Sequence, residues 1–107
     1  MAIIINSNNT SAIVNQIKGA ISEALERSGQ LVENEAAREC PVDTGRLQNS
    51  ITHEVEGHKK VVIGTNVEYA GYVENGTSKM RARPYLRKAL TNKQSKIADI
   101  FKEELEK

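Results

Sequence analysis

The sequence is poor in the residues that build aromatic cores and covalent cross-links. Its 107 residues include no tryptophan, one phenylalanine, two prolines and a single cysteine, Cys40. One cysteine excludes a disulfide within the chain and is typical of a reducing compartment. The apolar share is only 38% and is mainly aliphatic. We therefore expect a thin core, and association with other chains would cover more apolar surface.

Long apolar runs and an excess of one charge are also missing. No run approaches the roughly 20 apolar residues that a membrane-spanning helix needs, and residues 2–5 are too short for a signal peptide. The formal net charge of +1 gives no general attraction to nucleic acid or membrane. We expect one domain over residues 1–107, made in the cytoplasm.

The spacing of apolar residues predicts a long first helix. From Ser11 to about Cys40 they recur at steps of three and four, and Pro41 disfavours continuation. Gly29 is its expected weak point, because glycine costs roughly 1 kcal/mol relative to alanine in a helix. Thirty residues span roughly 45 Å, whereas a compact chain of this size has a radius of gyration of about 13 Å. The helix therefore bends near Gly29, or one end projects and needs a partner to cover its apolar stripe.

The middle of the chain predicts a small sheet. Residues 51–56 and 60–64 alternate apolar and polar side chains around the turn at Gly57, which is typical of an antiparallel hairpin at about residues 50–64. Three isoleucines in a row favour a short strand at Ala2–Asn6.

The remaining segments lead to a second helix. Residues 66–75 form a short helix or an ordered loop, and residues 76–83 form a loop. Pro84 suits the first position of a helix that runs to about Glu106. The predicted fold class is α+β, with a long N-terminal helix, a small antiparallel sheet, and a C-terminal helix packed beside the first.

No set of residues matches a catalytic or metal-binding pattern. His53, His58, Glu54 and Cys40 have no zinc spacing, and a second cysteine is missing. Cys40 ends a helix, where the dipole does not favour a thiolate, so we interpret it as a packed side chain. Phosphate-binding and dinucleotide-binding fingerprints are absent. We expect no enzyme activity, no cofactor and no metal.

Basic residues gather in the second half of the chain. Residues 75–98 contain no acid but seven bases: Lys79, Arg81, Arg83, Arg87, Lys88, Lys93 and Lys96. They indicate either a solvated helix face with a basic loop, or a contact for an acidic protein surface or a phosphate backbone.

Two tyrosines and two acids precede this basic segment. Tyr69 and Tyr72 share a face if this stretch is helical. They either pack against the hairpin or the Pro84 loop, or contact another subunit, since tyrosine is enriched at interfaces. We interpret Glu68 and Glu74 as hydrogen-bonded structural carboxylates rather than as an acid–base pair.

Three blocks of sequence resemble the small tail-completion proteins of long-tailed bacteriophages and prophages, a group of head–tail joining or neck components. The blocks are PVDTGRLQNSI at 41–51, IGTNVEYAGYVENGT at 63–77 and RPYLRKAL at 83–90. They occur in the expected order and span about half of the chain. Asn75 stands where an aromatic residue or histidine is common, and Gly71 where proline is common.

The resemblance implies a non-enzymatic virion protein that acts in tail completion or head–tail joining, located in the tail or neck after assembly in the bacterial cytoplasm. Its implied partners are other tail or connector proteins and further copies in a ring, with no membrane. The loop at 73–84 is expected to make partner contacts. The alternative is a nucleic-acid-binding module that uses the bases of residues 79–96, although DNA contact is not expected as the main role. The expected assembly contacts are Tyr69, Tyr72, Glu74, Lys79, Arg81 and Arg83.

Overall fold

The computed structural model describes residues 7–41 and 45–107. The strand expected at Ala2–Asn6 lies outside this part of the chain. The elements, in order, are α1 (Ser7–Glu39), α2 (Arg46–Ser50), β1 (Thr52–Glu56), β2 (Lys60–Gly64), α3 (Ala70–Asn75) and α4 (Tyr85–Leu105).

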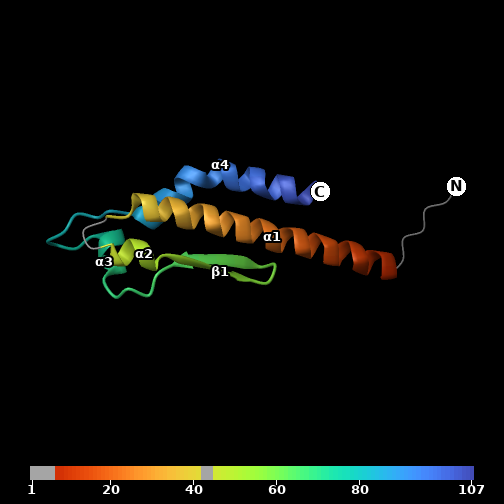
Figure 1. The fold of residues 1–107 in the computed structure, drawn as a ribbon, viewed down its shortest axis with the longest axis horizontal. Coiled ribbons are helices and arrows are strands. Elements are labelled where there is room, and N and C mark those ends of the chain that lie inside the picture. Colours follow the sequence, from red (N-terminus) through yellow and green to blue (C-terminus); the bar gives the residue numbers. More distant parts are fainter. Residues whose placement is uncertain (1–6, 42–44) are drawn as a thin grey trace.

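Helix α1 is the spine of the molecule, with α4 along one side and the β1–β2 hairpin along the other (Figure 1). Helix α4 runs antiparallel to α1, because Lys88 near its start pairs with Glu39, while Glu104 near its end pairs with Arg27. The hairpin is antiparallel, with His53 opposite Ile63 and Val55 opposite Val61. The predicted α+β fold, hairpin and paired helices are confirmed.

The core lies around the C-terminal half of α1. Cys40 is 3% exposed and sits in this cluster, which confirms its interpretation as a packed side chain. Helix α1 ends at Glu39, as expected from Pro41. The buried cluster consists of Val32, Ala36, Cys40, Leu47, Ile51, Val67, Ala70, Tyr85 and Ala89.

Gly29 lies where the hairpin meets α1, a contact that the sequence did not predict. The helix continues unbroken through it, and the hairpin crosses α1 at this residue. A Cβ atom on Gly29 would lie 2.7 Å from Val61 Cγ2 and 2.8 Å from His53 Cδ2. Glycine is required here because it allows the sheet to approach the helix closely.

His53 fastens the hairpin to α1 on either side of this crossing. Its Nε2 lies 2.8 Å from Glu26 Oε1, and its Nδ1 lies 3.1 Å from Glu33 Oε1. A neutral imidazole has only one N–H to donate, so satisfying both carboxylates requires the doubly protonated ring. The hydrogen bond with Glu26 accordingly raises the pKa of His53, assisted by Glu33 and opposed by burial.

The N-terminal part of α1 projects beyond both of its partners. Ser22 Oγ donates to the Gly57 carbonyl at the tip of the hairpin, at 2.8 Å, and Arg27 meets the end of α4. Residues 7–21, called the arm below, extend past this level (Figure 1). Of the two alternatives for a long helix, the projecting end is correct and the bend is wrong. The molecule accordingly measures 71 × 23 × 22 Å.

Candidate partner-binding surface

The loop between α3 and α4 is a shaped hook at the end of the molecule opposite the arm (Figure 1). Gly76 has a φ of 77°, and a Cβ there would lie 2.7 Å from the backbone nitrogen of Ala82. The Thr77 N–H donates to the Met80 carbonyl at 2.8 Å, and the Arg83 N–H donates to the Val73 carbonyl at 2.8 Å. Backbone hydrogen bonds therefore hold the loop, and its side chains are left to face outward.

Glu74 connects this loop to the start of α4. Its carboxylate accepts the backbone N–H groups of Leu86 at 2.9 Å and Arg87 at 3.3 Å, and also the Nε–H of Arg87 at 2.9 Å. The first N–H groups of a helix have no partners within the helix, so Glu74 caps α4 from a distant element. This confirms its structural role. Because both oxygens are used within the chain, we leave Glu74 out of the partner surface proposed below.

The structure divides the basic segment into two parts. Along α4, three of the four bases of this segment have carboxylate partners: Arg87 is 2.9 Å from Glu74, Lys88 is 3.2 Å from Glu39, and Lys93 is 3.8 Å from Glu35. Within residues 7–41 and 45–107, the loop bases Lys79, Arg81 and Arg83 pair with no carboxylate, and all three are exposed. Among the described residues, the loop therefore presents three positive charges that no carboxylate offsets.

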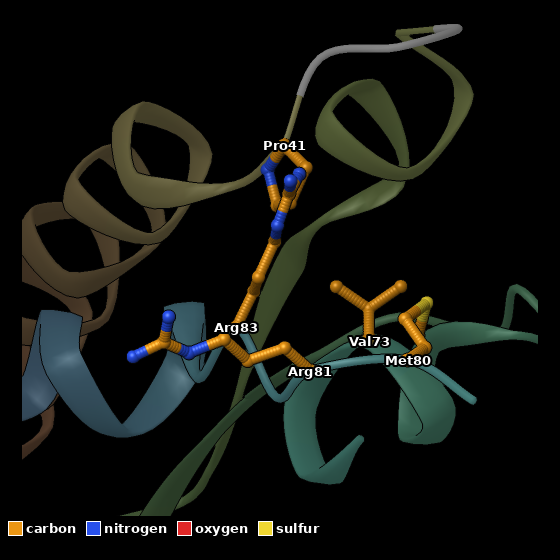
Figure 2. Close-up of a pocket in the computed structure, with 5 residues that line it drawn as sticks. All are labelled: Pro41, Val73, Met80, Arg81 and Arg83. Atoms are coloured by element: carbon orange, nitrogen blue, oxygen red, sulfur yellow. The ribbon is translucent and has the colours of Figure 1, made fainter. Parts of the chain in front are cut away.

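A hollow of about 210 Å³ lies under this loop. It is lined by Pro41, Val73, Met80, Arg81 and Arg83, with the two guanidinium groups pointing in different directions (Figure 2). Val73 and Met80 lie side by side as an apolar wall (Figure 2). Arginine presents a planar fork of donors that matches a carboxylate. The hollow is therefore suited to an acidic segment that also carries an apolar side chain.

The two tyrosines of α3 have separate environments. Tyr69 packs against the core cluster, and the guanidinium of Arg46 lies 5.6 Å from its ring centroid. Arg46 also forms two hydrogen bonds with Glu68, at 3.2 and 3.1 Å. Tyr72 is 61% exposed. Tyr69 precedes the first helical residue of α3, so the expected shared helical face does not form.

Sequence reasoning gave no role to Tyr85, which the structure makes central. It is 1% exposed, the largest fully buried side chain among the described residues, and burial, followed by the proximity of Cys40 and Glu74, raises the pKa of Tyr85 to about 12. The available signal was its position directly after Pro84 at a helix start. Burial likewise raises the pKa of Cys40, which weakens it as a nucleophile.

The described residues contain no group of three or more His, Cys, Asp or Glu side chains that is placed to hold a metal ion. A search of the same residues finds no helix both long and apolar enough to cross a membrane. The features that remain at this end of the molecule are the basic hook, its hollow and exposed Tyr72.

Residues 8–76 match the model of a family described as "Bacteriophage HK97-gp10, putative tail-component". The chain belongs to this family. No curated protein and no solved structure matches it. The match runs from the arm through α3 and stops at Gly76, so it covers α1, the hairpin and both short helices. A bacteriophage tail component is a virion protein that contacts other virion proteins, which agrees with the resemblance seen in the sequence.

Proposed function

We propose that this tail component acts in tail completion or head–tail joining as a non-enzymatic assembly protein. The hook at residues 76–84 docks on an acidic surface of a neighbouring tail or connector protein, and several copies form a ring at that joint. Tyr72, Lys79, Arg81 and Arg83 make the contact, and Tyr69 supports it from the core side. The protein acts in the bacterial cytoplasm during assembly and remains in the virion.

One observation carries this proposal. Within residues 7–41 and 45–107, the loop arginines have no carboxylate partner and lie beside an apolar wall, whereas the α4 bases nearest to them, Arg87 and Lys88, are paired. Charged side chains at an interface guide the encounter and fix the register, and arginine is among the residues enriched there. Family membership supports a virion role, and the hook supplies the surface.

The test is assembly with the Arg81→Ala, Arg83→Ala double variant. We expect the variant to fold with the wild-type melting temperature, since both side chains are exposed, and we expect joined particles to be lost in electron micrographs. The matched control is Lys96→Ala, Lys102→Ala, which removes the same charge from exposed positions on α4 and is expected to join normally. Normal joining by the loop variant would contradict the proposal.

The salt dependence of DNA binding distinguishes the proposed assembly role from the alternative, a nucleic-acid-binding module. A surface that contacts phosphates loses affinity for duplex DNA steeply as salt rises. We expect only weak binding to DNA, because three of the seven bases of residues 75–98 are paired with carboxylates in the folded chain. Tight binding with a steep salt slope, reduced equally by the loop variant and the α4 control, would favour the nucleic-acid reading.

A further inference from the structure

The arm carries an apolar stripe that no described part of the chain covers. Ile13, Val14 and Ile17 are 52%, 39% and 46% exposed. The stripe continues the face that α1 buries farther along, where Ala24 is 0% exposed and Ser28 is 4% exposed. An established helix-packing face therefore runs on past the ends of α4 and the hairpin.

The charge pattern of α1 also sets the arm apart. Residues 7–22 carry one charged side chain, Lys18, whereas residues 23–39 carry seven. A helix that stays in water normally has charged residues on its outer face. Charged residues are depleted at the cores of protein interfaces. The composition of the arm is therefore that of a contact surface.

A second apolar feature lies near the other end of the molecule. A hollow of about 210 Å³ opens where α1, β2 and α4 meet, lined by Val32, Ile63, Leu86, Arg87 and Leu90. Leu90 is 49% exposed, and the guanidinium of Arg87 is held by Glu74. The hollow thus presents aliphatic side chains and a charge that is already neutralised.

The arm cannot reach the hollow of its own chain. Ile17 lies fifteen residues before Val32 on one unbroken helix, a separation of about 22 Å along the axis. The hollow adjoins the buried core cluster, to which Val32 belongs and against which Ile63 and Leu86 pack. The arm stripe and the hollow therefore both continue faces that already pack within the chain.

We infer that the arm of one copy docks in the α1–β2–α4 hollow of a second copy, so that copies associate head to tail. Ile13, Val14 and Ile17 enter the hollow beside Leu86 and Leu90. Such a contact uses two different surfaces and is heterologous, so a suitable rotation between copies closes it into a ring. Ring closure at the virion joint rests on the proposed function, whereas the contact between copies forms in solution.

The test uses one variant of each surface. Ile17→Asp changes the arm and Leu90→Asp changes the hollow, both at exposed positions, so both proteins are expected to keep the wild-type circular dichroism spectrum. Sedimentation of the wild type up to about 1 mM is expected to show association, and each variant is expected to weaken it at least tenfold, about 1.4 kcal/mol. Val62→Asp, at 51% exposure on the outer face of β2, is the matched control and is expected to associate normally.

Mixing the two variants decides the geometry. Ile17→Asp retains an intact hollow and Leu90→Asp retains an intact arm, so the mixture is expected to form heterodimers that grow no further. A monomeric wild type at about 1 mM would overturn the inference. Normal association of Leu90→Asp, or no recovery in the mixture, would also overturn it and would indicate arm-to-arm pairing or another partner. The Arg81→Ala, Arg83→Ala variant is expected to self-associate normally, so failure of the proposed function is distinguishable from failure of this contact.

Discussion

Replacing Gly29 with alanine tests whether the hairpin is held by close contact with α1. Two effects oppose each other. Alanine is favoured over glycine within a helix by about 1 kcal/mol. The new Cβ, however, would lie 2.7 Å from Val61 Cγ2 and 2.8 Å from the His53 ring, whereas carbon atoms pack best at about 3.5–4.0 Å. The hairpin must therefore move outward by about 1 Å.

The cost of that movement sets the expected magnitude. Overpacking typically costs about 1–3 kcal/mol, so Gly29→Ala is expected to lower the free energy of unfolding by up to about 2 kcal/mol after the helix gain is subtracted. Gly19→Ala is the matched control, since nothing lies within 4 Å of its added Cβ. It gains helix propensity without a clash. Urea unfolding followed by circular dichroism measures both differences from the midpoint and slope.

A second substitution, Val61→Ala, shows whether the steric clash at Gly29→Ala causes the expected loss of stability. In a Val61→Ala background one of the two colliding groups is gone, so Gly29→Ala is expected to cost less than it does in the wild type. The difference between the two costs is a coupling energy between neighbouring residues. If Gly29→Ala stabilises the protein as much as Gly19→Ala does, the close approach of sheet and helix is refuted.

Three further perturbations test other parts of the structure. Because the Glu26 contact raises the pKa of His53, protonated His53 stabilises the fold fully below its unfolded pKa of about 6.5, and this stabilisation is lost as pH rises through the higher folded pKa. The midpoint of unfolding is therefore expected to fall over this pH window. His53→Gln is expected to flatten the pH profile, whereas His58→Gln, at the hairpin turn, is not. Glu74→Ala removes the cap of α4 and is expected to lower the free energy of unfolding by about 1–2 kcal/mol, measured by thermal unfolding. Glu68→Ala is expected to cost clearly less, and equal losses of stability would contradict the capping role. Tyr85→Ala is expected to lower the free energy of unfolding by about 3–5 kcal/mol. Tyr85→Phe keeps the buried ring and is expected to cost less than about 1 kcal/mol. Similar losses of stability for the two variants would show that the hydroxyl, not the ring, matters.

The regular elements were predictable because local signals specify them. Periodic apolar residues marked α1, Pro41 ended it, and Pro84 marked the start of α4. Alternation of apolar and polar residues marked the hairpin. These signals depend on neighbours within a few residues, so one sequence is enough to detect them.

The contacts between distant elements were not predictable. The sequence predicted Gly29 only as a weak point of the helix, because helix propensity contains no information about a sheet that crosses the helix at that residue. Glu74 caps a helix that begins eleven residues later, and His53 reaches two carboxylates on α1. The acid-free segment pointed to seven candidate bases. Only the three-dimensional arrangement separates Arg87, Lys88 and Lys93, which pair with carboxylates on other elements, from the hook bases, which pair with none among the described residues.

Electron microscopy of particles assembled without this chain tests the account most directly. Deletion of its reading frame from the phage is expected to leave filled heads and complete tails that remain separate. Supplying the wild-type chain is expected to restore joined particles, whereas the Arg81→Ala, Arg83→Ala variant is not. Joined, infectious particles in the absence of the chain would contradict the central claim that it works as a structural part of the joint.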